Sequence, residues 1–260
     1  MLFEKELNAA KEAGIKAKKV VLDYYHNGFN VEIKDDKSPV TQADKESDKI
    51  IREYLKARFP SYSFLTEESV DDKARLLNDY VWIIDPVDGT EDFIHYDDEF
   101  TINIGLAYKH QVVLGVVLVP AKNEIYYAVK DYGAYKINSD GITTRIHVSD
   151  KINDLTVLKS KYHSNQLEED IYKKYQNKIK EIKTAGSSLK ACYIAEGKAE
   201  LSYRKSDGTK EWDTCAFQII VEEAGGLVLK YDGTPITYNR EDVYNRGGYV
   251  IMNRKENFFF

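Results

Sequence analysis

Apolar residues recur every three to four positions over the first 25 residues, with charged residues between them. The series is Leu2, Phe3, Leu7, Ala10, Ala13, Ala17, Val20, Val21, Tyr24 and Tyr25. This spacing predicts an amphipathic helix that covers a sheet. A second helix is predicted to begin at 41–44, where Thr41 and Asp44 have the spacing of a capping box, and to end before Pro60.

Between residues 80 and 137 the pattern changes to short runs rich in β-branched and aromatic residues, which predict a meandering sheet. Its strands are expected at 80–84, 100–108, 112–119, 125–129 and 134–137. Beyond residue 153, strand-like and helix-like segments alternate. Helices are predicted at 167–178, 187–197 and 212–224, and strands near 156–160, 199–204, 227–231 and 248–252.

Residues 148–153 carry few apolar anchors, so we place a boundary there. The prediction is an N-terminal α/β half, residues 1–148, with a meandering antiparallel sheet, and a C-terminal α/β half, residues 149–260. Two α/β units packed side by side form a layered α/β architecture.

The composition and charge of the chain exclude several classes of protein. With 260 residues, 43% of them hydrophobic, the chain can bury one large core or two modest ones. The net charge of −6 is spread along the sequence, which leaves no basic face for polymeric nucleic acid. Cys192 and Cys215 lack metal-ligand spacing and indicate a reducing compartment, so a cytoplasmic location is expected. The charged first helix cannot be a signal peptide, and no apolar run reaches a membrane-spanning length.

The clearest chemical motif is Asp85-Pro-Val-Asp-Gly-Thr90, directly after the strand predicted at 80–84. Pro86 restricts the backbone and has no N–H to donate a hydrogen bond, so Asp85 and Asp88 can converge on one point while the Val87 carbonyl turns inward. Hard divalent cations prefer such oxygen ligands. The pair Glu67-Glu68 and Asp213, near the start of a predicted helix, could supply further carboxylates.

Each acid alone also has an ordinary structural explanation. The Asp85 motif could be a surface turn, Glu67-Glu68 a solvated pair, Asp213 a helix cap and Asp44 half of a capping box. Two other acidic chemistries fail by counting. An EF-hand loop starting at Asp85 would place Val87 and Gly89 at ligand positions, and an aspartyl-phosphate phosphatase needs its two acids two residues apart rather than three.

Taken together with Trp212-Asp213 and the Glu67-Glu68 pair, the Asp85 motif is similar to the signatures of the inositol-monophosphatase-like superfamily, and the resemblance covers nearly the whole chain. It implies an α-β-α-β-α sandwich of the sugar-phosphatase type, with two or three Mg²⁺ ions between the halves. Metal ligands would be Glu67, Asp85, the Val87 carbonyl, Asp88 and Asp213. Asp44, acting through Thr90, would orient and deprotonate the attacking water, with Glu67 also contributing to catalysis. Paired metal ions lower the pKa of water and neutralise charge on both reacting oxygens.

Within the superfamily, residues 38–44, 99–104, 186–190 and 195–204 resemble the 3'(2'),5'-bisphosphate nucleotidases. A second phosphate needs an anion site. Three groups could provide it: the N-terminus of a helix starting after Gly186, the positive charge of Lys190 and the guanidinium of Arg204, which can contact two oxygens. The resemblance implies a pocket for the nucleotide and its phosphates lined by Asp88, Gly89, Thr90, Ser160, His163, Ser187, Lys190, Arg204 and Asp213. Glu91 departs from the pattern, because these nucleotidases often carry a lysine at that position.

The expected function is therefore hydrolysis of adenosine 3',5'-bisphosphate, a small nucleotide, to AMP and phosphate, with inhibition by lithium. Two alternatives stay open at this point. One is an inositol monophosphatase or a broader sugar-phosphate phosphatase. The other is a non-catalytic regulator of the same fold that binds nucleotide or metal. The sequence predicts no particular oligomeric state.

Overall fold

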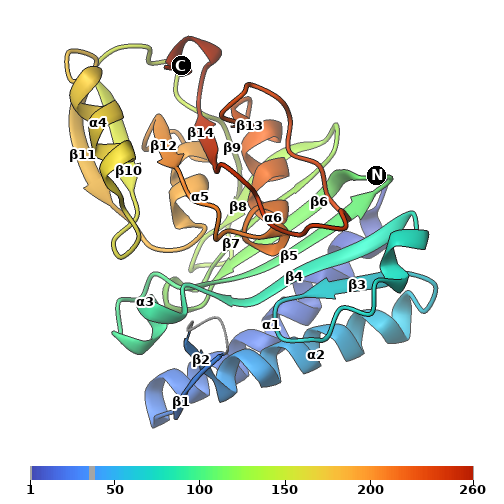
Figure 1. Ribbon diagram of the computed structural model, residues 1–260. Helices are drawn as coiled ribbons and strands as arrows, with labels where there is room; N and C mark the ends of the chain where they lie inside the picture. The colour runs from blue at the N-terminus through green and yellow to red at the C-terminus, as the bar shows by residue number, and fades with distance from the viewer. Residues whose placement is uncertain (1, 35–38, 260) are drawn as a thin grey trace.

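A computed structural model describes residues 2–34 and 39–259 (Figure 1). The N-terminal periodicity forms α1 (Glu4–Asn27), and α2 (Gln42–Arg58) follows the antiparallel strands β1 (Val31–Ile33) and β2 (Pro39–Thr41). The capping box is present: the Thr41 hydroxyl accepts from Ala43 N–H at 3.1 Å, and Asp44 accepts from Thr41 N–H at 2.9 Å. Both predicted helices are confirmed. Ser38, part of the nucleotidase-like stretch 38–44, lies outside the described residues.

The predicted meander forms most of a seven-stranded sheet. In spatial order its strands are β3 (Ser63–Thr66), β4 (Tyr80–Asp88), β5 (Thr101–Tyr108), β6 (Gln111–Val119), β7 (Glu124–Val129), β8 (Gly133–Ile137) and β9 (Thr143–Ile146). Strands β4 to β9 pair antiparallel, whereas β3 runs parallel to β4. The edge strands β3 and β9 were not predicted, because each has only four residues and β9 is mostly exposed and polar.

The C-terminal half contains a five-stranded sheet and three longer helices. The spatial order of the strands is β11 (Ile179–Thr184), β10 (Leu155–Lys159), β12 (Leu201–Arg204), β14 (Tyr249–Met252) and β13 (Leu227–Lys230). The helices are α4 (Gln166–Lys174), α5 (Leu189–Ala195) and α6 (Glu211–Glu223). A short α3 (Thr90–Ile94) and the 3₁₀ turns η1 (Ala74–Leu77), η2 (Pro120–Lys122) and η3 (Lys255–Asn257) complete the description.

The helix predicted over 167–178 extended too far. The structure ends α4 at Lys174, and β11 follows at the edge of the five-stranded sheet. Four of the six residues of β11 are exposed, and its lysines and glutamate make it as polar as the helix end before it. Charged residues are common on edge strands, where they discourage pairing with other chains.

The elements stack as five layers (Figure 1). Helices α1 and α2 cover one face of the seven-stranded sheet, α5 and α6 lie between the two sheets, and α4 covers the outer face of the five-stranded sheet. Three clusters of buried apolar side chains hold these layers together. One lies between α1, α2 and the seven-stranded sheet, one surrounds α5 and α6, and one lies between α4 and the five-stranded sheet. The predicted α-β-α-β-α sandwich is confirmed.

Two glycines bring α6 onto the seven-stranded sheet. A methyl group on Gly115 would lie 2.0 Å from the Ala216 carbonyl oxygen, and one on Gly105 would lie 2.5 Å from Cys215 Sγ. Only a residue without a side chain permits this approach. The close packing fixes α6, whose first turn carries Asp213, against the strands that carry the other acids.

The chain leaves the seven-stranded sheet at Ile146 and enters the five-stranded sheet at Leu155. The largest apolar cluster takes residues from both sheets and from α5 and α6. The proposed division at residue 148 stays a prediction about domain organisation. In the described ranges 2–34 and 39–259, every helix is too short or too polar to cross a lipid bilayer.

Candidate metal and phosphate site

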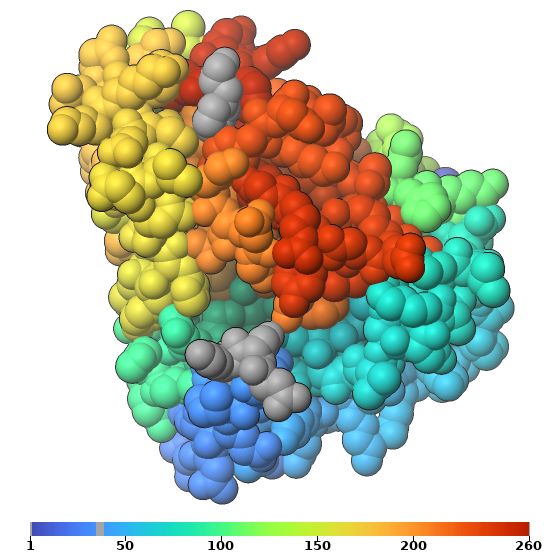
Figure 2. Space-filling view, in the orientation of Figure 1, coloured from blue at the N-terminus to red at the C-terminus, as the bar shows by residue number. Residues whose placement is uncertain are grey.

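A cavity of about 550 Å³ lies between the end of β4 with α3 on one side and α5, β12 and α6 on the other, and Figure 2 shows the surface hollowed between the green segment around α3 and the orange C-terminal segments. Among the lining residues are Glu67, Asp85, Val87, Asp88, Gly89, Thr90, Ser160, His163, Ser187, Lys190, Arg204 and Asp213. The structure therefore brings together every predicted site residue except Asp44, which lies buried behind Thr90.

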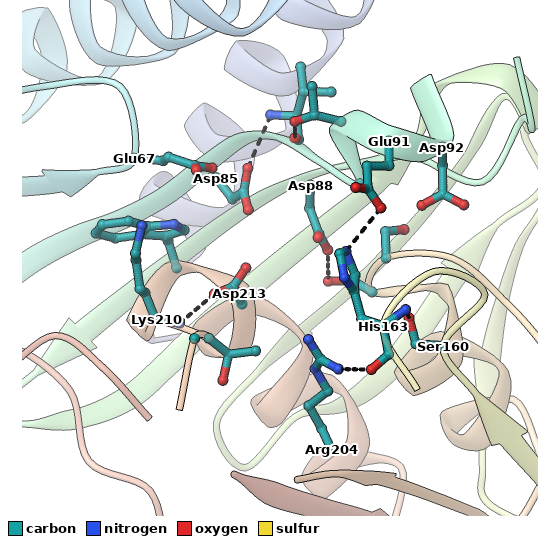
Figure 3. A pocket seen from close by; sticks show the side chains of 18 of the residues that line it. Glu67, Asp85, Asp88, Glu91, Asp92, Ser160, His163, Arg204, Lys210 and Asp213 are labelled. Atoms are coloured by element: carbon teal, nitrogen blue, oxygen red, sulfur yellow. Dashed lines mark hydrogen bonds and ion pairs between the residues drawn. The ribbon is translucent and has the colours of Figure 1, made fainter. Parts of the chain in front are cut away.

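Three carboxylates converge at the floor of this cavity (Figure 3). Asp85, Asp88 and Asp213 each offer an oxygen within 4.8 Å of the other two. The pairing of β4 with β5 is irregular between Asp85 and Asp88, where Pro86 interrupts the ladder, so both acids reach the same space. Burial and the nearby negative charges hold the pKa of Asp85 well above its usual range, and raise the pKa of Asp213 to about 7.

This donor set fits a hard divalent cation. Buried carboxylates in mutual contact repel one another unless they are protonated or share a positive ion. Only oxygen atoms converge here, which suits Mg²⁺ or Ca²⁺ better than a soft metal. The arrangement could therefore hold a metal ion.

Three neighbours orient Asp88 and were not predicted as functional. Its Oδ2 accepts from Ser188 Oγ at 2.6 Å, from Asn103 Nδ2 at 3.0 Å and from Thr101 Oγ1 at 3.3 Å. A buried asparagine among the apolar residues of strand β5 is a signal that could have identified Asn103.

Glu67 lies at the cavity wall, outside the compact group of three. Its Oε1 is 3.0 Å from Lys34 Nζ, and Lys34 also contacts Glu68. The contact could not be predicted from the sequence, because Lys34 stands in a polar segment without any motif around it. The role of Glu67 as a metal ligand stays a prediction, and it would require the carboxylate to exchange Lys34 for a metal ion.

Asp44 and Thr90 form a hydrogen-bonded pair beside the acids. Thr90 Oγ1 lies 3.2 Å from Asp44 Oδ1 and 3.4 Å from the Val87 carbonyl oxygen. The other oxygen of Asp44 accepts from the hydroxyl and the N–H of Thr41. Burial raises the pKa of Asp44. The capping box thus also positions a carboxylate that can receive a proton through Thr90.

The basic side of the cavity is partly occupied by contacts within the protein. Lys190 Nζ donates to the Ser187 carbonyl at 2.7 Å and to the Ala185 carbonyl at 3.2 Å, and burial lowers its pKa. Arg204 donates to the carbonyl of His163, whose own N–H donates to Ser160 Oγ at 3.1 Å. Lys190 and Arg204 therefore both face the cavity, and Figure 3 shows Arg204 on the side away from Asp85.

Ser187 differs from the expectation that it would open a helix. Helix α5 begins two residues later, at Leu189, because Ser187 has a positive φ of 40°. Its hydroxyl donates to the carbonyl of Glu99 at 2.5 Å. The side chain still lines the cavity.

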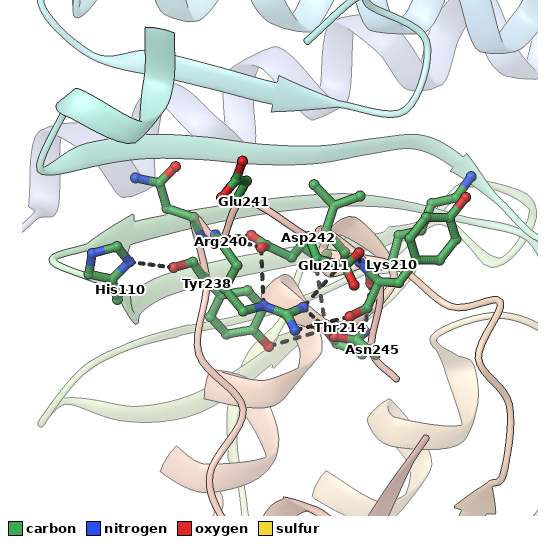
Figure 4. Close-up of polar contacts among 12 residues, drawn as sticks. His110, Lys210, Glu211, Thr214, Tyr238, Arg240, Glu241, Asp242 and Asn245 are labelled. Carbon is green, nitrogen blue, oxygen red and sulfur yellow. Dashed lines mark hydrogen bonds and ion pairs between the residues drawn. The ribbon is translucent and has the colours of Figure 1, made fainter. Parts of the chain in front are cut away.

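A buried carboxylate fixes the start of α6 (Figure 4). Glu211 is fully buried and accepts from Asn239 N–H at 2.6 Å, from Arg240 N–H at 2.8 Å and from Arg240 Nε at 3.2 Å. Asn245 then connects the network to the carbonyl of Lys210, whose N–H donates to Asp213. Glu211 thereby positions the turn that presents Asp213.

Glu211→Gln is expected to lower the free energy of unfolding by about 2–3 kcal/mol, because Arg240 would lose its charged partner. Urea denaturation measures the change. The exposed Glu53→Gln on α2 serves as control and should change stability by less than about 0.5 kcal/mol. Equal stability of the two variants would contradict the assigned role.

Asp92 is a buried acid on the cavity wall, and burial raises its pKa to about 7, an effect that Lys190 only partly offsets. Since the folded-state pKa lies above the ordinary value, the favourable contribution of neutral Asp92 is present below about pH 4 and is lost as the pH rises through 7. Asp92→Asn should therefore raise the free energy of unfolding at pH 8 by roughly 1–2 kcal/mol and change it little at pH 4.

Urea denaturation at both pH values tests this expectation. Asp140→Asn, in the exposed turn between β8 and β9, should give the same small change at pH 4 and pH 8. If Asp92→Asn has the same free energy of unfolding as the wild type at pH 8, the ionised carboxyl does not destabilise the fold.

The comparisons with known proteins agree with this geometry. Residues 3–257 match the model of the inositol monophosphatase family. The chain is 36% identical to the 3'(2'),5'-bisphosphate nucleotidase CysQ of Buchnera aphidicola subsp. Acyrthosiphon pisum, over 85% of this chain and 83% of that protein. It is 32% identical to the CysQ nucleotidase of Aggregatibacter actinomycetemcomitans, over 88% of this chain and 85% of that protein.

Among solved structures, the crystal structure of CysQ from Bacteroides thetaiotaomicron, a bacterial member of the inositol monophosphatase family, superposes with a TM-score of 0.82 at 32% identity. The match covers 97% of this chain and 99% of that one. These relatives confirm the resemblance to bisphosphate nucleotidases. The chain therefore belongs to the inositol monophosphatase family.

Proposed function

We propose that this chain is a magnesium-dependent 3'(2'),5'-bisphosphate nucleotidase, which hydrolyses the 3'-phosphate of adenosine 3',5'-bisphosphate to AMP and phosphate. The observation that carries the proposal is one cavity with converging Asp85, Asp88 and Asp213 on one side and Lys190 and Arg204 on another. The acids suit a metal at the reacting phosphate, and the cations suit a second phosphate. The similarity to CysQ nucleotidases supports the choice of substrate.

Two or three Mg²⁺ ions would be held by Glu67, Asp85, the Val87 carbonyl, Asp88 and Asp213. When bound, these ions lower the pKa of water and neutralise charge on the phosphate oxygens. Thr101, Asn103 and Ser188 hold Asp88 in place through its Oδ2. This support keeps the carboxylate oriented before the substrate arrives.

Asp44 and Thr90 would position the attacking water. Thr90 donates its hydroxyl hydrogen to Asp44, which leaves an oxygen lone pair free to accept a hydrogen bond from water. The water proton would pass through Thr90 to Asp44 as the water oxygen attacks phosphorus. The bond from phosphorus to the ribose 3'-oxygen would break, and that oxygen would take up a proton from water to give the 3'-hydroxyl of AMP. Gly89 and Thr90, next to the acids on the cavity wall, would contact the phosphate being transferred.

The nucleotide would extend toward the C-terminal half. Lys190 supplies a compact positive charge, and Arg204 supplies a planar group that can contact two phosphate oxygens. Ser160, His163 and Ser187 would line the rest of the nucleotide pocket.

A substrate panel with and without Mg²⁺ tests the proposal. Adenosine 3',5'-bisphosphate, inositol 1-phosphate and fructose 1,6-bisphosphate would be compared by phosphate release. The expected result is Mg²⁺-dependent hydrolysis with the highest kcat/KM for the nucleotide. A preference for inositol 1-phosphate, or equal release without a divalent cation, would overturn the assignment.

A further inference from the structure

Two consecutive acids of α3, Glu91 and Asp92, line the cavity that also contains Lys190 and Arg204 (Figure 3). The proposed metal site includes neither acid. Glu91 Oε2 lies 3.3 Å from His163 Nε2, and both residues line the cavity. Asp92 is only 4% exposed, and its Oδ1 has no hydrogen-bond partner among the residues that the structure describes.

The position of Asp92 places its charge between the two ends of the proposed substrate site. A methyl group on Gly186 would lie 2.3 Å from Asp92 Oδ1, and one on Gly89 would lie 3.0 Å from Asp92 Oδ2. Gly89 belongs to the turn that follows the metal ligands, and Gly186 precedes Ser187 on the nucleotide side. The carboxyl of Asp92 therefore lies between the groups proposed to contact the two phosphates.

His163 does not cancel the charge of Glu91. Burial lowers the pKa of the imidazole, and the nearby Arg204 and Lys190 charges lower it further, whereas Glu91 opposes them. A neutral imidazole donates a hydrogen bond to the carboxylate and leaves its negative charge in place. The negative charges of Glu91 and Asp92 thus oppose the attraction of Lys190 and Arg204 for a second phosphate.

We propose that Glu91 and Asp92 determine selectivity by phosphate number: their negative charges weaken binding of a substrate's second phosphate, so that the pocket also accepts nucleotide monophosphates. This inference rests on the proposed nucleotidase function. A carboxylate several ångströms from a phosphate dianion in a water-filled cavity should change affinity roughly 5- to 10-fold, and added salt should reduce the effect.

The test compares kcat/KM for adenosine 3',5'-bisphosphate with kcat/KM for adenosine 3'-monophosphate, which lacks the second phosphate, at pH 8, above the pKa of about 7 of Asp92. Glu91→Gln and Asp92→Asn remove one charge each and keep the side-chain size. Each should raise the ratio roughly fivefold, mainly through a lower KM for the bisphosphate. The ratio should return toward the wild-type value in about 0.5 M salt.

Two further variants separate charge from shape. Glu53→Gln removes an equal charge from the exposed face of α2, away from the cavity, and should leave the ratio unchanged. His163→Gln breaks the contact with Glu91 but keeps the Glu91 carboxylate, so the ratio should not rise.

An unchanged ratio in both Glu91→Gln and Asp92→Asn would overturn the inference while leaving the nucleotidase proposal intact. An equal rise in His163→Gln would also overturn it, because the effect would then come from the broken contact. If the wild-type protein hydrolysed neither nucleotide, the proposed function would fail and the inference with it.

Discussion

Asp85→Asn is expected to lower kcat for phosphate release by about 10²–10³-fold or more, because Asp85 is the most deeply buried acid of the converging group. Asparagine keeps the shape but removes a negative charge that would bind the cation and offset charge in the transition state. Phosphate release with saturating nucleotide and Mg²⁺ measures the loss. Asp140→Asn, an exposed aspartate in the turn after β8, is the matched control and should retain full activity.

The same variant has a second, independent expected result. Without divalent ions, Asp85→Asn should be more stable than the wild type, because it removes repulsion among Asp85, Asp88 and Asp213. Mg²⁺ should then raise the melting temperature of the wild type more than that of the variant. Equal rates of phosphate release in the two proteins would refute the role of Asp85.

Thr90→Val should lower kcat by about 10²-fold while changing KM little, the loss typical of removing a group that assists proton transfer. Valine has nearly the shape of threonine but cannot donate to Asp44 or accept from water. Steady-state kinetics separates the two parameters. Thr90→Ser, which keeps the hydroxyl, should recover most of the activity. A valine variant as active as the serine variant would remove Thr90 from the mechanism.

Much of the fold could be predicted because the pattern of apolar residues is strong where elements are long. The spacing of Leu7, Ala10, Ala13, Ala17 and Val21 predicts α1, and all five residues are buried in the structure. The signal fails for short or exposed strands. In β11, Ile179 and Ile182 are the only apolar residues among charged and polar neighbours over six positions, so the pattern predicted no strand there.

The chemical groups of the site were predictable where they form a local motif. Asp85 and Asp88 are separated by two residues on one strand, and local backbone geometry brings them together. Some of the groups that contact the predicted metal ligands come from distant positions. Ser188 meets Asp88 across 100 residues, and Lys34 meets Glu67 across 33. Such contacts depend on how the layers stack, which no single segment encodes.

The beginning of α5 shows the same limit on a smaller scale. Ser187 and Ser188 resemble an ordinary helix start, but the Ser187 hydroxyl donates to the carbonyl of Glu99, which lies just before β5 and 88 positions earlier in the chain. Ser188, rather than Ser187, contacts a predicted metal ligand. The sequence therefore indicates the right segment, while the tertiary contact decides which serine supports the metal site.

The most direct test of the central claim is a crystal of the protein soaked in Mn²⁺ and measured at the manganese absorption edge. Mn²⁺ shares the preference of Mg²⁺ for oxygen ligands and gives an anomalous signal. The account predicts an anomalous peak among the carboxylates of Asp85, Asp88 and Asp213, about 2.0–2.3 Å from their oxygens. Peaks confined to other surfaces, with these three carboxylates bound to no ion at saturating Mn²⁺, would contradict it.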